Sequence, residues 1–267
     1  MNHSNLAQYS TIDFTDYKLP KILYHDGSFH AFDVNKIVVQ KHHPYNSGQV
    51  VDFMYQLPFA DGHMEVVDIK IKAPGMMALW GLAPYKAPNT QQCVADPAGN
   101  IKYTLSLSYM DIADGSDYEA FYKTMQKLDI KILNEIFARR EQLFTNPVIK
   151  AGNKDFLQSM YKGATATRVG KNGQEYPPML KLKTTKAFSQ WRCKAYGPDL
   201  EEIVPDSIEK ECVVKSLFTF KGVWFGSGAE FSPILQIDQI QLVKNRDLDK
   251  CVLGMDCNEE ASAAGFI

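Results

Sequence analysis

The chain has 267 residues, of which 45% are hydrophobic and 22% are charged. These values are those of a folded globular protein, and they exclude a disordered or collagen-like chain. The formal net charge of -2 excludes a global positive field that would attract nucleic acid, so any such site must be local.

The sequence shows no sign of a membrane or secretory route. No run of about 18 apolar residues occurs, so we expect no transmembrane helix and no membrane partner. The N-terminal segment lacks the basic and apolar regions of a secretory signal, so we expect an intracellular protein. The five cysteines form no CxxC pair, which favours reduced thiols.

Residues 19–107 alternate short apolar runs with turn signals. Their spacing of roughly 12 residues is typical of antiparallel strands in a barrel or sandwich. Residues 102–110 alternate with a period of two, so one side of this strand is predicted to face the core. That side carries Tyr103, Leu105, Leu107 and Tyr109.

A helical pattern begins at Ser116. Ser116 and Glu119 form a capping box, and apolar residues then recur at intervals near 3.6. This pattern predicts a helix of about 28 residues whose buried stripe contains Phe121, Met125, Leu128, Ile132, Ile136 and Leu143. A shorter helix is predicted from the cap Asn153 to Tyr161, ending at Gly163.

Strand patterns return after residue 163, at 179–184, 213–225 and 234–243. In the first of these, Leu180 and Leu182 are predicted to face the core, and Met179, Lys181 and Lys183 to face the other way. Strands, helices and strands in this order predict an α+β, mostly β fold. We expect one domain over residues 1–250, a β-barrel with a helical insertion near 116–163, followed by an acidic tail at 251–267.

Motifs for catalysis are absent from the sequence. It contains no GxGxxG, GxxxxGK[ST], HExxH or GxSxG motif and no zinc-deaminase pattern. We therefore expect no enzyme, no cofactor and no metal site.

Charge is strongly divided within the second half of the chain. Residues 161–194 hold eight basic residues against Glu175 alone, a net charge of +7. Residues 195–211 hold six acidic residues against Lys210, a net charge of -5. The basic segment also contains the rings of Tyr161, Tyr176, Phe188 and Trp191.

Interleaved cations and rings suit single-stranded nucleic acid. Lys and Arg bind phosphates, and flat rings stack on unpaired bases. A solvated strand face would have the same composition, so this alternative stays open. Aromatic and basic residues also combine at Trp80, Tyr85 and Lys86, where surface stacking and core packing are equally compatible with the sequence.

The predicted DNA-binding residues combine these two regions. They are Trp80, Tyr85, Lys86, Arg168, Lys171, Tyr176, Lys181, Lys183, Lys186, Phe188, Trp191, Arg192 and Lys194. In the tail, Asp256, Glu259, Glu260 and Phe266 combine carboxylates with an apolar tip, which can compete with DNA for a basic groove or bind a pocket in a partner protein.

Three segments resemble a known family. The segment DYEAFYKTMQKLDIKILNEIFARREQLF, the strand EYPPMLKLK and the C-terminal GVWFGSGAEFSPILQIDQIQLV are similar, in that order, to the single-stranded DNA-binding proteins of large double-stranded DNA viruses. Those proteins resemble the phage T7 type of single-stranded DNA-binding protein. The resemblance covers roughly residues 72–243.

This resemblance implies an oligonucleotide-binding (OB-fold-like) barrel with one long and one short inserted helix. It implies a non-enzymatic protein that coats exposed strands, regardless of sequence, during viral DNA replication, recombination or repair in the host cytoplasm or nucleus. Single-stranded DNA is the implied partner, and a replicative polymerase or helicase would bind through the tail. Homo-oligomers are compatible with it.

The family pattern falls in this sequence on Tyr176, Pro177, Pro178, Lys181, Lys183, Trp224, Gly226, Gly228, Phe231 and Gln239. Gly226 and Gly228 suit a tight connection that requires positive φ. Trp224 is predicted as a core ring more readily than as a stacking platform. The chain departs from the family at Ala229 and Glu230, where a basic residue is expected.

The alternative to a DNA-binding module is a structural or scaffold protein of a virion with a β-sandwich fold. The first hypothesis predicts salt-sensitive binding that prefers single strands. The second predicts large closed assemblies without that preference.

Overall fold

The structure is a computed structural model. It describes residues 21–23, 29–45, 48–58, 63–86, 92–96, 98–109, 115–144, 146–165, 167–169, 173, 175–226 and 230–245. The predicted tail residues Asp256, Glu259, Glu260 and Phe266 lie outside these ranges, as does Lys171.

Strands make up most of the described chain. They are β1 (Lys21–Leu23), β2 (Phe29–Ala31), β3 (Ile37–Tyr45), β4 (Gly48–Pro58), β5 (Met64–Val67), β6 (Ile69–Lys72), β7 (Met76–Pro84), β8 (Ile101–Ser108), β9 (Arg168–Val169), β10 (Glu175–Tyr176), β11 (Met179–Ala187), β12 (Gln190–Trp191), β13 (Lys194–Tyr196), β14 (Glu202–Ile203), β15 (Cys212–Phe225) and β16 (Phe231–Lys244). The helices are α1 (Asp117–Ala138), α2 (Arg140–Leu143), α3 (Pro147–Ala151) and α4 (Lys154–Met160), with short 3-10 turns η2 (Val34–Lys36) and η3 (Pro205–Ser207).

Five of these strands form a closed circuit. β7 pairs with β8, β8 with β11, β11 with β16, β16 with β15, and β15 returns to β7. Only the β11–β16 pairing in the circuit is parallel. An OB-fold is likewise a five-stranded Greek-key barrel. The pairings therefore agree with the predicted OB-like, mostly β fold, and the helices lie between β8 and β11, as expected.

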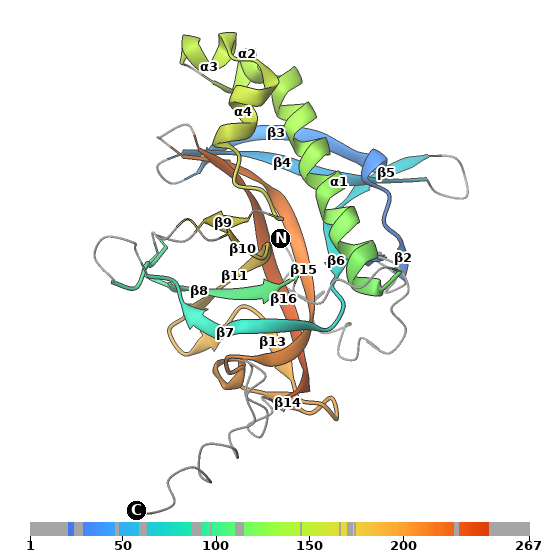
Figure 1. Cartoon of the computed structure of the whole chain (residues 1–267), viewed down its shortest axis with the longest axis vertical. Helices are drawn as coiled ribbons and strands as arrows, with labels where there is room; N and C mark the ends of the chain where they lie inside the picture. The colour runs from blue at the N-terminus through green and yellow to red at the C-terminus, as the bar shows by residue number, and fades with distance from the viewer. Residues whose placement is uncertain are drawn as a thin grey trace, which may run out of the picture.

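The long strand β15 joins this circuit to further strands. Its first residues pair with β7, its middle with β6 and its last residues with β4, while its other edge pairs with β16 along its length. β3 and β5 flank β4, and β1 and β2 continue from β6. In Figure 1, β3, β4 and β5 cross above the circuit, and α1 runs diagonally beside them.

A bulge in β7 depends on a glycine. The register to β8 shifts between Ala78 and Leu82, and Gly81 has a φ of 64°. A Cβ atom at Gly81 would lie 2.4 Å from the Ile208 carbonyl oxygen. Glycine is required here both by its φ and by this close approach. The bulge leaves the neighbouring Trp80 side chain 66% exposed.

The start of α1 is as predicted, but its end is not. The Ser116 hydroxyl accepts a hydrogen bond from the Glu119 N–H. The helix ends at Ala138, and α2 and α3 follow as separate short helices, so the prediction of one 28-residue helix was wrong. At the break the backbone of Arg139 leaves helical geometry, with φ -107° and ψ 10°, and the Arg140 guanidinium group donates to the carbonyls of Phe137 and Lys150 across the turn.

The predicted apolar stripe is buried despite this break, through Leu143 in α2. The short helix is confirmed as α4, whose cap Asn153 accepts from the Phe156 N–H. Of the described helices, none is long and apolar enough to cross a membrane.

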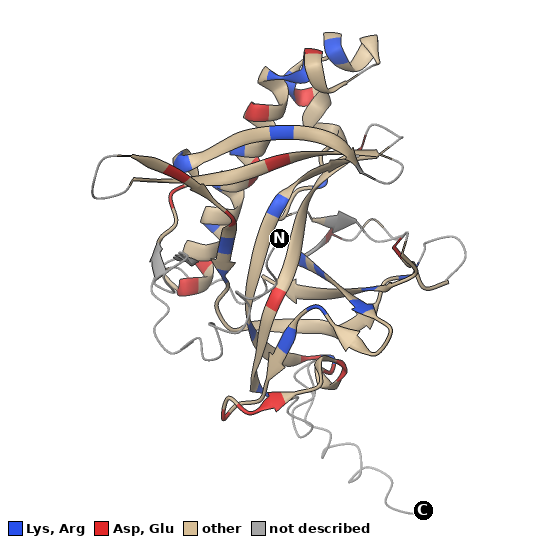
Figure 2. Cartoon of the chain, turned by 180° about the vertical axis from the view of Figure 1, so that it is seen from behind, with Lys and Arg blue, Asp and Glu red and all other residues tan. Residues whose placement is uncertain are grey.

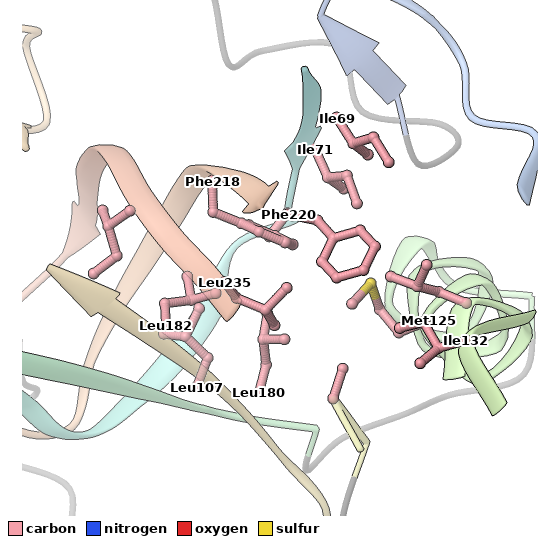
Figure 3. Packing of buried hydrophobic residues seen from close by; sticks show 14 of the residues in the cluster. Ile69, Ile71, Leu107, Met125, Ile132, Leu180, Leu182, Phe218, Phe220 and Leu235 are labelled. Atoms are coloured by element: carbon pink, nitrogen blue, oxygen red, sulfur yellow. The ribbon is translucent and has the colours of Figure 1, made fainter. Parts of the chain in front are cut away.

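The core has two connected parts, shown in Figure 3. Leu107, Leu180 and Leu182 point into the circuit, which confirms the predicted core faces of β8 and β11. Phe220 and Met125 lie where β15 and α1 meet. All of these side chains are less than 2% exposed and belong to one continuous cluster.

A buried carboxylate ties α1 to the segment after α4. Asp129 accepts four hydrogen bonds: from the Tyr161 hydroxyl (2.7 Å), the Ala164 N–H (2.8 Å), and the Thr165 N–H (3.0 Å) and hydroxyl (2.8 Å). Burial raises the pKa of Asp129, and the hydrogen bonds oppose this shift. Burial, together with the nearby Asp129 carboxylate, raises the pKa of Tyr161 well above its ordinary value, so its hydroxyl stays a donor.

The cysteines permit a simple labelling prediction. Cys93 is exposed, whereas burial raises the pKa of both Cys193 and Cys212 to about 11. Because the thiolate is the reactive form, we expect one thiol to react with iodoacetamide at pH 8 in the folded variant Cys251→Ser/Cys257→Ser. Mass spectrometry of the alkylated protein would count the labels. Two or three labels before unfolding would contradict the buried positions, and adding Cys93→Ser should remove the label.

Candidate nucleic-acid interface

A groove of about 780 Å³ lies across the five-stranded circuit. Its walls come from β8 and β11, from the segment between β7 and β8, from the residue that follows β12, and from the adjoining ends of β15 and β16. The lining residues are Tyr85, Ala95, Asp96, Lys102, Tyr103, Thr104, Lys183, Thr184, Thr185, Arg192, Trp224, Ile234 and Gln236. OB-folds bind oligonucleotides on the corresponding face, over their second and third strands and the adjoining loops.

Two lysines lie on the floor of the groove. Lys102 is opposite Thr185, and Lys183 is opposite Thr104, so strand register places both lysines on one face. Neither forms an ion pair with a described residue. Lys183 is accessible to solvent, but the groove around it desolvates its ammonium group and lowers its pKa, and repulsion from Lys102 lowers it further. A bound phosphate would relieve this repulsion.

Arg192 adds a third cation at the end of the groove. The exposed Arg192 lies close enough to Asp96 to help lower the pKa of that carboxyl, although the hydrogen bond from Asn100 contributes most. Asp96 also accepts bonds from the N–H groups of Ala98 and Asn100, so its main task is to shape the segment before β8. Three cations against one carboxylate leave the groove with a net charge of +2.

Aromatic rings stand among these cations. Tyr85 is 41% exposed at the end of β7, and Trp224 is half-buried near the end of β15. Tyr103 packs against the core beside Leu105, as predicted, and its ring also reaches the groove wall. Trp224 therefore lines the groove, whereas its sequence context favoured the core.

The structure brings only part of the predicted site together. Tyr85, Lys183 and Arg192 line the groove. Lys181 lies on the same face of β11, opposite Ser106 and one pair further along the strand. Lys86 is exposed directly after Tyr85. Lys102, Tyr103 and Trp224 line the groove as well but were not among the predicted DNA-binding residues.

Several predicted residues do not line the groove. Trp191 packs against Tyr103 with ring centroids 4.5 Å apart, and the Lys186 ammonium lies 4.8 Å from the Trp191 centroid. Lys186 also forms an ion pair with Asp206 at 3.0 Å. Lys194 lies on β13, paired with β16. Trp191 and Lys186 therefore pack at the base of the β11–β12 hairpin, where they are paired across the two strands.

Two predicted rings project elsewhere on the surface. Phe188, at the tip of the β11–β12 hairpin, is 99% exposed and has a φ of 53°. Trp80 lies at the β7 bulge, next to Gly81 in the chain, and is 66% exposed. Neither ring lines the groove.

The hairpin β9–β10 contains Arg168 and Tyr176, whose side chains lie outside the described part of the structure. Figure 1 shows its ribbon above β11. The role of these two residues and of Lys171 in DNA binding stays a prediction.

The acidic segment forms a different surface. In Figure 2, acidic positions cluster at the lower end, near β14, while basic positions occur along strands in the right half of the view. Asp199, Glu201, Glu202, Asp206 and Glu209 are all exposed there. This separation explains how a chain with a net charge of -2 can present a basic groove.

The connection between β15 and β16 is braced by rings and by the helical insertion. Phe225 and Phe231 stack with centroids 5.3 Å apart, and Tyr161 packs on Phe231 at 5.1 Å. Glu230 forms an ion pair with Lys162 at 3.4 Å. This pair accounts for the acidic residue at a position where the family resemblance led us to expect a basic one.

Comparison with known proteins is informative only at the level of solved structures. No protein-family model and no curated protein sequence matches the chain. The gp2.5 single-stranded DNA-binding protein of bacteriophage T7 is similar, with 11% identity and a TM-score of 0.41 over 75% of this chain and 99% of gp2.5.

The single-stranded DNA-binding protein of bacteriophage Enc34, solved in complex with ssDNA, has 13% identity and a TM-score of 0.38 over 79% of this chain and 97% of that chain. Its C-terminally truncated form has 14% identity and a TM-score of 0.38, over 80% and 98% of the two chains. The first of these solved structures, gp2.5, is a single-stranded DNA-binding protein of phage T7, the phage named in the sequence resemblance.

Proposed function

We propose that this protein binds single-stranded DNA without sequence specificity and coats strands that are exposed during viral DNA replication, recombination or repair. The proposal includes binding without catalysis. It also includes action at viral replication sites in the host cell, and recruitment of a polymerase or helicase by the acidic tail.

The groove across the circuit is the observation that carries this proposal. Lys102, Lys183 and Arg192 can bind successive phosphates, and Tyr85 and Trp224 offer ring surface for unpaired bases. The groove lies on the face that OB-folds use for oligonucleotides. Among the residues that the structure describes, the neighbouring Asp96 is the one carboxylate beside these cations in the groove.

The same composition favours single strands over duplex. Stacking on Tyr85 or Trp224 requires bases with exposed faces, which a duplex buries within its own stack. Stacking also tolerates any base, because every base has a flat face, so the same rings support binding without sequence specificity.

Fluorescence anisotropy of labelled single- and double-stranded oligonucleotides at several salt concentrations tests the proposal. We expect tighter binding of single strands of any sequence. With three groove cations, a plot of the logarithm of the affinity against the logarithm of the salt concentration should have a slope of about -2 or steeper.

Equal affinity for single strands and duplex, or no binding at all, would refute the proposed function. Sedimentation of the free protein adds a second check. Large closed assemblies together with an absence of strand preference would support the structural-protein alternative instead.

A further inference from the structure

The side chain of Trp224 leaves β15 on the groove side of the sheet. Its neighbours Val223 and Phe225 are buried at 0% and 3% exposure, so strand alternation directs Trp224 away from the core. Main-chain pairing holds this position on both edges, opposite Val50 of β4 and Ser232 of β16. The backbone that carries the indole is therefore fixed.

Two glycines leave room for the indole ring. A Cβ atom on Gly226 would lie 2.7, 3.1 and 3.5 Å from three carbons of its six-membered ring. A Cβ atom on Gly48 would lie 2.1 Å from the Phe225 carbonyl oxygen and 3.0 Å from the indole Nε1. The ring thus lies directly over Gly226 with its nitrogen beside Gly48, and Trp224 also lines the groove.

Backbone conformation does not explain the glycine at 226. The sequence led us to expect a positive φ there, and this expectation was wrong, because Gly226 is not among the described residues with positive φ. Its N–H donates to the Glu230 carbonyl at 2.9 Å, which any residue other than proline could do. A side chain at position 226 would instead displace the Trp224 ring.

We propose that Trp224 is a base-stacking platform of the groove and that Gly226 is the residue that positions it. Gly226 supports one side of the indole, so the ring stays in place before a base arrives. A ring that is already oriented loses little conformational freedom on binding. This inference rests on the proposed binding of single-stranded DNA.

The substitution Gly226→Ala tests the inference with little risk to the fold. The three nearest atoms to the added methyl group all belong to the Trp224 ring, which can rotate, so the backbone need not move. We expect near-parental stability but a loss in single-strand affinity of roughly 10-fold, similar to that of Trp224→Ala. Quenching of Trp224 fluorescence by single-stranded DNA, read in a Trp80→Phe/Trp191→Phe background, should fall in parallel.

Two comparisons separate positioning from a merely structural effect. Gly226→Ala should cause no further loss when combined with Trp224→Ala, because both changes remove the same contact. It should also be harmless in a Trp224→Phe background, because phenylalanine lacks the outer ring atoms that the methyl group would meet. Gly75→Ala is the control, since its Cβ would lie 3.4 Å from Val213 Cγ1, at ordinary contact distance.

The outcomes distinguish this inference from the proposed function. If the parent protein does not bind single strands, the proposed function itself fails. If the parent binds but Trp224→Ala binds equally well, Trp224 is not a platform. If Trp224→Ala weakens binding but Gly226→Ala does not, or if the two losses multiply, Gly226 does not position the ring. Whenever the parent protein binds single strands, the proposed function stands, and each of these results for Trp224 or Gly226 refutes the inference alone.

Discussion

Reversing the charges of Lys102 and Lys183 together should lower the affinity for single-stranded DNA about 100-fold. Each lysine is expected to contribute a charged contact worth about 1.5 kcal/mol, and two such losses amount to roughly a factor of 100. The reversed groove would hold Arg192 against three carboxylates, with Asp96 as the third. Anisotropy titrations of Lys102→Glu/Lys183→Glu at fixed salt measure the loss.

Neutral substitutions give a second, independent reading of the same site. Lys102→Gln/Lys183→Gln should reduce the magnitude of the salt slope by about 1.4, because each phosphate contact on a single strand contributes about 0.7. The matched control for the neutral variant is Lys127→Gln/Lys154→Gln, which removes two positive charges at exposed helical positions, and Lys127→Glu/Lys154→Glu is the matched control for the charge reversal. If either control weakens binding as much as its groove variant, the effect reflects net charge and the groove is not the binding site.

Replacing Asp129 by alanine should lower the free energy of unfolding by about 3 kcal/mol. The change leaves the Tyr161 hydroxyl and the N–H groups of Ala164 and Thr165 without their acceptor. A buried donor that loses its partner costs about 1 to 3 kcal/mol. Urea unfolding followed by circular dichroism measures the loss, and Asp129→Asn should be intermediate because its amide retains one acceptor oxygen.

The control for Asp129 is an exposed acidic residue of the same helical layer. Glu141→Ala in α2 should change stability by less than about 0.5 kcal/mol. The same small change for Asp129→Ala would refute its role. Tyr161 also packs on Phe231 at the base of the β15–β16 connection, so Asp129→Ala should weaken single-strand binding to a smaller extent than the lysine reversal.

The sequence predicted the features that depend on neighbouring residues. Alternation identified Leu180 and Leu182 as the core face of β11, and both are fully buried. The serine at 116 and the asparagine at 153 were correctly predicted as helix caps, because capping joins a side chain to an N–H group two or three residues away. Charge counting also located a basic and an acidic segment correctly.

Periodicity could not show where α1 ends. The apolar stripe continues to Leu143, which is buried in α2, so the pattern of burial persists although the helix does not. The turn at the break is bridged by the hydrogen bond from Arg140 to the Lys150 carbonyl. Such a contact between separate helical segments leaves no periodic signal in the sequence.

The site itself was only partly predictable for a similar reason. Lys186 and Trp191 have the composition of a DNA site, yet they pack on each other and on Asp206 and Tyr103. Lys102 was not among the predicted residues, because its place beside Lys183 in the groove depends on the register between β8 and β11. The residue types indicated a basic, aromatic region, but the sequence did not show which of these residues are neighbours in the folded protein.

Local chain chemistry alone therefore determined the strands, the helix starts, the core faces and the presence of a basic, aromatic region. The tertiary structure decided which cations and rings share one groove, and it gave Gly226 its role beneath Trp224. The physical reason is that alternation and capping act over a few residues, whereas the groove forms only when strands far apart in the chain pair in one register and close into a circuit.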